Sequence, residues 1–457
     1  MMDQTKMKTA EKLFMSCQFD KAFPILEELA KENDLRKLVI ESNSRALFFL
    51  GLLYRYGLGH VQRDEEKSQD ALGKSVIRGE PAAWLEIAEM AYPYSEDFAT
   101  ASETLPDRLR KAAEAGDLIA QNALGLLYVR GWALPRDVEE GARWLKRSAD
   151  GGYFMAMVNL GMLYKERALG NGKEKEAWSY FLRAAGLGYR LGEYHLGECY
   201  YEGTGVEQDW EKAITCYKKA LSHGSMEAAD ALGTMAVLGE GMPVDEKAAF
   251  TYFRTAVKGQ YTASLSKLGD CYYFGRGTEQ DFGRARDLFE KAWYNVDRVA
   301  AVRMGTIYLS GLGVEPNAQR AVKWFTRAAT AGDPDGCLYL AECAWYGKGM
   351  PVNKKKAISL YVEAAESGQE QAMTRLGQIA LDEDRAKEAV QWFTRAAELG
   401  FTTAENFLAI CYYKGAGVPR NEKTAREWLD RSENQGDEEA PLIKQNLWGI
   451  TPGSFKQ

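Results

Sequence analysis

Residues 196–224 read LGECYYEGTGVEQDWEKAITCYKKALSHG, and this stretch holds one complete copy of the unit that decides the fold. Its first two residues, or a close variant of them, return every 36 residues along the chain. The anchoring residues of this series are Leu124, Leu160, Leu196, Leu232, Leu268, Met304, Leu340 and Leu376. A fixed period of this length predicts a stack of repeated units, each packed against its neighbours.

Apolar residues within each copy predict two amphipathic helices, because they recur at steps of three and four residues. Gly203 and Gly205 form a Gly-x-Gly turn between the two predicted helices, and Asp209 is placed to cap the second helix. Gly224 follows that helix, at the position where a residue with left-handed backbone angles ends a helix. Each unit is therefore predicted to be a helical pair, and the chain an all-α solenoid.

The consensus of the copies, LGxxYxxGxGVxxDxxKAxxWxxxAAxxG, resembles the Sel1-like repeat, a relative of the tetratricopeptide repeat. The resemblance implies a right-handed superhelix of antiparallel helix pairs that binds other proteins. It covers residues 46–436 in eleven units, whose anchors are Leu50, Leu85, Leu124, Leu160, Leu196, Leu232, Leu268, Met304, Leu340, Leu376 and Leu408. Residues 1–45 are predicted to form capping helices that resemble a tetratricopeptide hairpin, and residues 437–457 a capping helix and tail.

Three units depart from the consensus at the turn between their helices. The unit at Leu85 has AYPYSEDFATASETLP there, which predicts an irregular hairpin that could contact a partner. The unit at Leu160 has ERALGNGKEK, and the unit at Leu376 lacks four residues of its turn. We expect the array to continue through these units, because repeat stability is approximately a sum over neighbouring interfaces.

The recurring Gly-x-Gly could be mistaken for part of a dinucleotide-binding fingerprint. That fingerprint follows a strand and opens a helix, whereas these glycines follow a predicted helix and recur in most units. The three histidines, His60, His195 and His223, lie at different offsets within their units. The sequence therefore predicts no catalytic residue, no metal ligands and no cofactor site, and the expected protein is not an enzyme.

Most of the seven cysteines follow the repeat. Four of them occupy the third position after the anchor and are predicted to be buried apolar residues, namely Cys199, Cys271, Cys343 and Cys411. Secreted cysteine-rich members of the resembled family pair a late Cys of one unit with an early Cys of the next. Here Cys337 is early but Ala329 fills the late position, which favours a reducing compartment. A redox-sensitive pair of Cys199 and Cys216 is the alternative.

Alternate units share a second pattern, with an acid two residues and an aromatic residue five residues after the anchor. Positions three apart share a helix face, and the resemblance implies that first helices line a concave side. The candidate partner-binding residues are Glu198, Tyr201, Asp270, Tyr273, Glu342, Trp345 and, at the aromatic position of the last unit, Tyr413. Aromatic anchors beside acids would accept a peptide or helix carrying Lys or Arg. Packing of the aromatic residues between repeats, with the acids merely solvated, is the alternative.

The composition excludes two partner classes. Apolar residues make up 46% of the chain, yet no run approaches the about 18 apolar residues of a membrane span. The formal net charge of −7 gives no basic surface for nucleic acid. The opening MMDQTKMKTAEKLF has no apolar core of a secretory signal, so a cytoplasmic location is expected.

Two functional classes fit these expectations. One is a scaffold or adaptor that gathers protein or peptide partners. The other is a dedicated inhibitor, such as an immunity protein that neutralises one toxin, for which an acidic groove would suit a basic target. Recognition of a polysaccharide by the aromatic row is a third class, against which the cytoplasmic start argues. A monomer without a cofactor is expected in each case.

Overall fold

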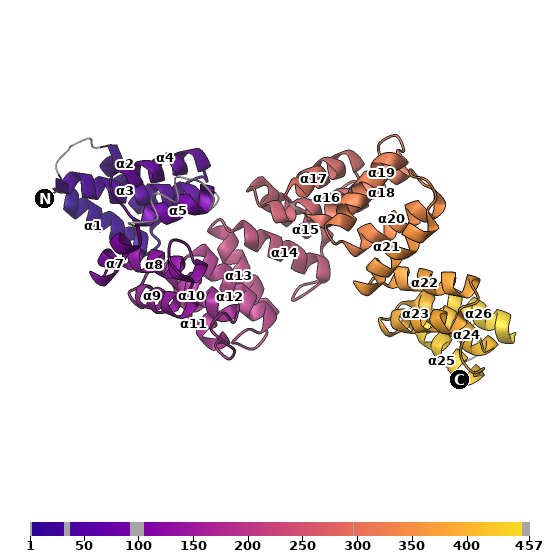
Figure 1. Ribbon diagram of the computed structural model, residues 1–457. Helices are drawn as coiled ribbons and strands as arrows, with labels where there is room; N and C mark the ends of the chain where they lie inside the picture. Colours follow the sequence, from indigo (N-terminus) through magenta and orange to yellow (C-terminus); the bar gives the residue numbers. More distant parts are fainter. Residues whose placement is uncertain (1, 32–36, 92–104, 296, 450–457) are drawn as a thin grey trace. The chain divides into compact units, whose positions relative to one another are not determined.

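The computed structural model describes residues 2–31, 37–91, 105–295 and 297–449, and all regular structure in these ranges is helical. Helices that follow one another in the chain pack together in pairs, as the repeat predicts (Figure 1). Contacts divide the chain into two compact units, Met1–Tyr261 (unit 1) and Thr262–Gln457 (unit 2). The architecture of each unit is an α-solenoid, and the all-α prediction is confirmed.

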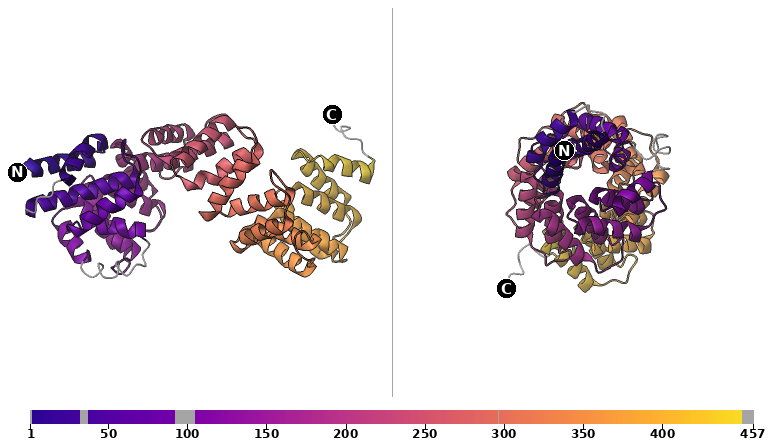
Figure 2. Two further views of the ribbon diagram at one scale, coloured as in Figure 1. Left: turned by 90° about the horizontal axis from the view of Figure 1, so that it is seen from above. Right: turned by 90° about the vertical axis from the view of Figure 1, so that its left-hand side faces the viewer.

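Unit 1 begins with a helical hairpin and continues into the repeats (Figure 2). Its helices are α1 (Met2–Met15), α2 (Phe19–Lys31), α3 (Lys37–Tyr56), α4 (Glu65–Ile77), α5 (Ala82–Ala91), α7 (Leu105–Glu114), α8 (Leu118–Arg130), α9 (Val138–Asp150), α10 (Phe154–Lys165), α11 (Glu174–Gly186), α12 (Arg190–Glu202), α13 (Trp210–Ser222), α14 (Met226–Leu238) and α15 (Glu246–Lys258). Most of the segment predicted to protrude from the Leu85 unit, residues 92–104, lies outside the described residues.

Unit 2 opens with a short 3-10 turn, η1 (Thr262–Ser264), and then repeats the helical pair. Its helices are α16 (Leu265–Phe274), α17 (Phe282–Tyr294), α18 (Arg298–Ser310), α19 (Ala318–Thr330), α20 (Pro334–Tyr346), α21 (Lys354–Glu366), α22 (Glu370–Asp382), α23 (Ala386–Glu398), α24 (Thr402–Lys414), α25 (Glu422–Asn434) and α26 (Glu439–Trp448). In both units we call the helix that carries the anchor the first helix of its pair.

The glycine that follows the anchor lets the two helices of a pair approach closely. An aromatic ring of the second helix lies against this glycine, and a Cβ there would come within 2.6 Å of a ring carbon in four units. The four pairs are Gly161 with Phe181, Gly197 with Tyr217, Gly233 with Phe253, and Gly269 with Phe289. The repeating Leu-Gly is therefore explained by packing, since any larger residue would displace a buried ring.

The Gly-x-Gly turns have an equally local explanation. A Cβ on the second glycine would overlap the backbone at the start of the second helix of the preceding pair, as it would between Gly349 and Ala318. The next helix is then capped by an Asp or Asn side chain that accepts a hydrogen bond from the backbone N–H three residues on, as Asn353 does from Lys356 at 2.9 Å. The predicted turn and cap are confirmed, and the glycines contact the chain itself.

The phase of the repeat also decides the environment of the cysteines. Cys199, Cys271, Cys343 and Cys411 are buried, as predicted. Burial raises the pKa of the Cys343 and Cys411 thiols to about 11. Cys199 and Cys216, the proposed redox pair, are both free thiols in this structure.

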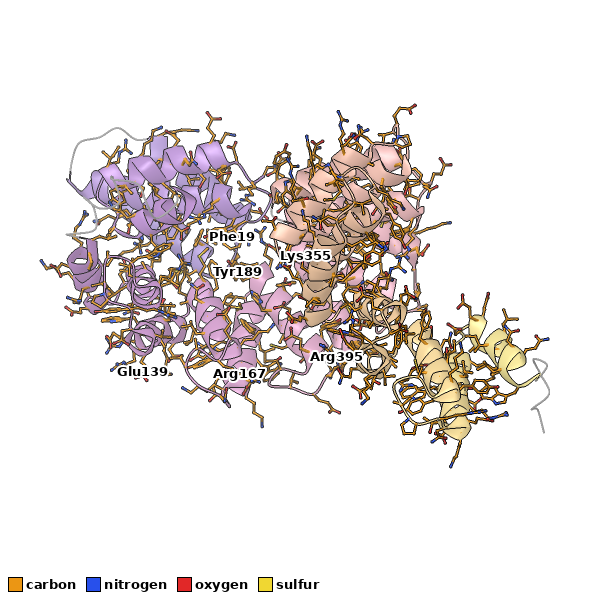
Figure 3. The ribbon with its side chains drawn as sticks, turned by 45° about the vertical axis from the view of Figure 1, so that its right-hand side comes forward. Phe19, Glu139, Arg167, Tyr189, Lys355 and Arg395 are labelled. Carbon is orange, nitrogen blue, oxygen red and sulfur yellow. The ribbon has the colours of Figure 1, made fainter. Side chains whose placement is uncertain are left out.

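The N-terminal hairpin of unit 1 contacts helices that follow it by more than a hundred residues. The ring of Phe14 lies 4.3 Å from that of Phe49 and 5.7 Å from that of Phe154, and Phe154 lies 4.5 Å from Tyr189. Figure 3 labels Phe19 and Tyr189, which lie close together in this aromatic cluster. Burial of several large rings in one cluster holds the hairpin to the repeats.

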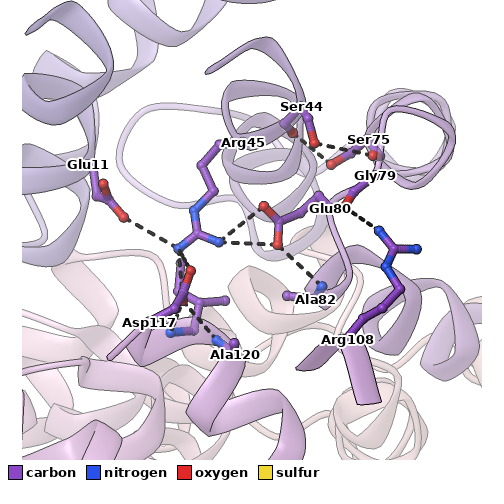
Figure 4. Close-up of polar contacts among 11 residues, drawn as sticks. Glu11, Ser44, Arg45, Ser75, Gly79, Glu80, Ala82, Arg108, Asp117 and Ala120 are labelled. Atoms are coloured by element: carbon purple, nitrogen blue, oxygen red, sulfur yellow. Dashed lines mark hydrogen bonds and ion pairs between the residues drawn. The ribbon is translucent and has the colours of Figure 1, made fainter. Parts of the chain in front are cut away.

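A buried arginine joins the same parts of unit 1. Arg45 of α3 donates hydrogen bonds to Glu80 at 3.1 Å and to Asp117 at 3.0 Å, and it also pairs with Glu11 of α1 (Figure 4). Burial alone would lower the pKa of Arg45, but the three carboxylates outweigh it and raise that pKa above its ordinary value. The guanidinium therefore stays charged and ties α1 and α3 to the starts of later helices.

Candidate partner-binding site

The acid of the first predicted pair, Glu198, lies in a network of polar side chains on α10 and α12 of unit 1. Its carboxylate accepts hydrogen bonds from the hydroxyl of Tyr194 at 3.0 Å and from Lys165 Nζ at 3.0 Å. His195 Nδ1 lies 2.8 Å from the same carboxylate. Burial would raise the pKa of Glu198, but hydrogen bonding to His195 and the charges of His195 and Lys165 outweigh it and lower that pKa to about 2.

The two equivalent acids of unit 2 are also paired. Asp270 of α16 accepts a hydrogen bond at 2.8 Å from Nε of Arg303 on the next first helix, α18. Glu342 of α20 lies 3.5 Å from Nε of Arg375 on α22, and it accepts a hydrogen bond at 2.6 Å from the hydroxyl of Tyr361. Each acid thus meets an arginine that directly precedes the anchor of the following pair.

The predicted aromatic residues lie partly inside the packing of the pairs. Tyr273 packs against Phe282 and Phe289 of α17, at ring distances of 5.5 and 6.3 Å. Trp345 lies 6.4 Å from the ring of Tyr361 on α21.

The remaining two predicted aromatic residues use their hydroxyl groups within the chain. Tyr201 donates a hydrogen bond to Glu240 at 2.7 Å, and Tyr413 donates one to the carbonyl of Leu447 in α26 at 2.9 Å. All the predicted residues therefore have contacts within the protein, and their role in partner binding stays a prediction.

The exposed aromatic residues stand one position further along the helix. Phe274 and Tyr346, six residues after their anchors, are 42% and 50% exposed. Arg303 lies over the ring of Phe274 at 5.1 Å, and Arg375 lies over the ring of Tyr346 at 5.5 Å and donates a hydrogen bond to its hydroxyl. Sequence reasoning missed these four residues. The available signal was the Arg before the anchors Met304 and Leu376, two units apart.

A pocket of about 450 Å³ opens among the first helices of unit 2. We call it the unit 2 pocket, and its lining includes Leu309 of α18, Tyr339 and Glu342 of α20, Arg375 and Gln378 of α22, and Thr403 of α24. No second helix contributes a side chain to the lining that the structure describes. First helices of successive pairs therefore form one continuous lined surface in unit 2.

The comparable hollow in unit 1 has a different origin. A pocket of about 410 Å³ lies between the turn after α1 and the ends of later helices, and its lining includes Cys17, His60, Arg190 and His223. Arg190 donates a hydrogen bond to the carbonyl of Gly57 at 3.0 Å beside this pocket. The pocket is thus a seam where the N-terminal hairpin and the Gly57 turn meet the later repeats.

Two negative findings apply to the part of the chain that the structure describes. Its helices include none with the length and apolar character needed to cross a membrane. Its His, Cys, Asp and Glu side chains form no group of three or more suited to holding a metal ion.

Stacked helical pairs that present a continuous lined surface define a helical repeat protein of the α-solenoid class. The family model for the Sel1 repeat matches residues 44–70, 118–153, 154–189, 190–225, 227–261, 262–292, 298–333, 334–369, 371–401 and 402–437. These ten segments make up well over half of the chain, which therefore belongs to the Sel1 repeat family. The unit anchored at Leu85 lies outside the matched segments. Repeats of this family generally mediate protein–protein interaction and are typically non-catalytic scaffolds.

Solved structures of similar fold agree with this assignment. A protective antigen present in uropathogenic Escherichia coli strains, described as displaying an SLR fold, is 30% identical with a TM-score of 0.60 over 83% of this chain and 82% of its own. A Sel1 repeat protein from Oxalobacter formigenes is 24% identical with a TM-score of 0.46, over 60% of this chain and 96% of its own. An immunity protein from Pseudomonas aeruginosa is 19% identical with a TM-score of 0.36, over 47% and 82%. A comparison with curated proteins finds no match.

Proposed function

We propose that the protein is a non-enzymatic scaffold or adaptor that holds a segment of a partner protein on the first-helix surface of unit 2. The observation that carries the proposal is the unit 2 pocket, because its lining comes from four successive first helices. A pocket of about 450 Å³ falls in the size range of about 300–1,000 Å³ that is usual for ligand sites.

The side chains at this surface are of the types that dominate binding energy in protein interfaces. Tyr346 and Arg375 form one exposed aromatic–arginine pair, and Phe274 and Arg303 form a second. Tyr and Arg are enriched among interface residues whose truncation strongly weakens binding. Because the two pairs stand at the same repeat position, 72 residues apart, one extended partner segment could use both.

The proposal is tested by filling the pocket without disturbing the core. Gln371 lines the pocket and is exposed, so Gln371→Trp adds bulk at the site while leaving the buried faces of α22 intact. Gln319→Trp is the matched control, since Gln319 is exposed on the second helix α19. The full chain and both variants, tagged, are used to capture partners from the source cells, followed by mass spectrometry.

We expect partners of the native protein to be retained by Gln319→Trp and lost by Gln371→Trp. Identical partners on all three proteins would overturn the proposal, because binding would then use another surface. The number of captured proteins separates two roles. Several partners of modest affinity support a scaffold, while one tightly bound protein supports a dedicated inhibitor, such as an immunity protein.

A further inference from the structure

The unit 2 pocket carries more positive than negative charge. Arg375 and Lys348 line it together with a single carboxylate, that of Glu342. This carboxylate already accepts the hydroxyl proton of Tyr361 in a hydrogen bond and faces Arg375, so its charge is engaged inside the protein. Lys348 is exposed, and its nearest ring is that of Tyr346, 5.7 Å away. No carboxylate in the described ranges pairs with Lys348.

Arg375 also has hydrogen-bond donors to spare. Its Nη1 donates to Gln378 at 2.9 Å and its Nη2 donates to the hydroxyl of Tyr346. A guanidinium has five N–H groups, and Nε has no hydrogen-bond partner in the structure as described. The pocket therefore presents one ammonium group and several guanidinium donors without matching acceptors.

Apolar side chains form the rest of the wall. Leu309 of α18, Leu338 of α20 and Phe401 at the start of α24 line the pocket beside these cations. Gln371 and Thr403 add an amide and a hydroxyl group at the rim. Apolar surface with a few directed polar groups is the usual composition of a site that binds a ligand specifically.

We propose that the unit 2 pocket binds a partner segment in which a carboxylate stands beside a large apolar side chain. The carboxylate lies at Lys348 and Arg375, and the apolar side chain lies against Leu309 and Phe401. This inference rests on the proposed function and adds the chemistry of the partner. It reverses the expectation of a basic partner, because Glu198, Asp270 and Glu342 are each engaged by a cation or hydroxyl of the protein itself.

The test uses a random dodecamer peptide library displayed on phage and selected against the full chain. Enriched peptides are synthesised with a fluorescent label, and their affinity is measured by anisotropy at low and at high salt. Lys348→Glu reverses the charge at an exposed residue, so it leaves the fold intact. Lys355→Glu is the charge-matched control, because Lys355 is exposed on the second helix α21 of the same unit (Figure 3).

We expect enriched peptides that place Asp or Glu next to Leu, Ile or Phe and that bind Lys348→Glu at least tenfold more weakly than Lys355→Glu. Their affinity should also fall as salt rises, because the contact is charged. Enrichment of basic or uncharged peptides, equal affinity for the two variants, or no enrichment at all would overturn the inference. Basic or uncharged peptides that are lost on Gln371→Trp would overturn only the partner chemistry. Peptides that bind Gln371→Trp normally would count against the proposed site itself.

Discussion

The contact between Gly161 of α10 and Phe181 of α11 makes a quantitative prediction for Gly161→Ala. The added Cβ would lie 2.6 Å from Cε1, 2.9 Å from Cζ and 3.0 Å from Cδ1 of the ring. Carbon atoms in contact are about 3.5–4.0 Å apart, so the ring must move by about 1 Å. Phe181 is fully buried, and the space around it is filled.

Two opposing terms set the size of the effect. Inserting a methyl group into a packed core costs about 1–3 kcal/mol. Replacing glycine by alanine inside a helix gains about 0.5–1 kcal/mol. The expected net effect is therefore a loss of about 1 kcal/mol in the free energy of unfolding, within a range of about 0–2.5 kcal/mol.

Gly73→Ala isolates the steric term, because it carries the helix gain alone. Gly73 lies inside α4 of the same unit, and a Cβ there would have no atom within 4 Å. We expect Gly73→Ala to stabilise unit 1, so that the two variants differ by about 1–3 kcal/mol, the cost of overpacking. The free energies are measured by urea unfolding of the full chain followed by circular dichroism, with hydrogen exchange of α10 and α11 as a local readout.

A second substitution checks that the ring is the cause. Phe181→Leu makes room for the methyl group, as in the last pair, where Ala409 and Leu429 share a buried cluster. In the Phe181→Leu background we expect Gly161→Ala to cost at least about 1 kcal/mol less than in the native protein. The reasoning is refuted if Gly161→Ala is as stable as Gly73→Ala, or if the cost is the same in both backgrounds.

Three further results are expected. Gly349→Ala should destabilise unit 2 by more than about 1 kcal/mol, because φ is +73° there and the new Cβ would overlap the Ala318 carbonyl; a urea midpoint unchanged from the native protein would contradict this. Glu198→Gln should remove a pH dependence of stability: the pKa of Glu198 falls from 4.5 to about 2 on folding, so its charge stabilises the protein above pH 4.5 by at most about 3 kcal/mol, and this is lost as pH falls toward 2. Unfolding free energies between pH 7 and 3 that have the same slope in the variant would count against the network. Cys343 and Cys411, whose pKa burial raises to about 11, should react with iodoacetamide at pH 8 far more slowly in the native protein than in urea, and equal rates would show that they are accessible.

The helical pair was predictable because its determinants lie within a few residues of one another. Gly349 and Asn353 stand at fixed distances from the anchor Leu340, and the turn and the cap they form are those expected from the pattern. The burial of Cys343 followed in the same way, from a position that Leu or Ile fills in other units. Local spacing on a helix settles which positions face its partner helix.

The lined surface was only partly predictable. Position within one helix indicated that an acid and an aromatic residue share a face, but it did not show that Arg303 and Arg375, each 33 residues further on, neutralise Asp270 and Glu342. The same reasoning selected the aromatic residue five positions after the anchor. The more exposed ring is the next one, as Tyr346 shows, because the second helix covers part of the first.

By itself, the sequence determined the all-α class, the helical pair, its turns and caps, and the membership in a repeat family. Only the tertiary structure decided which acids are neutralised, which rings stay exposed, where a pocket opens, and that Phe14 meets Phe154 in unit 1. The reason is physical. Turns, caps and helix faces depend on neighbours within one or two helical turns. Contacts between successive pairs depend instead on how far each pair rotates against the last, and this is set by the packing of side chains from distant parts of the chain.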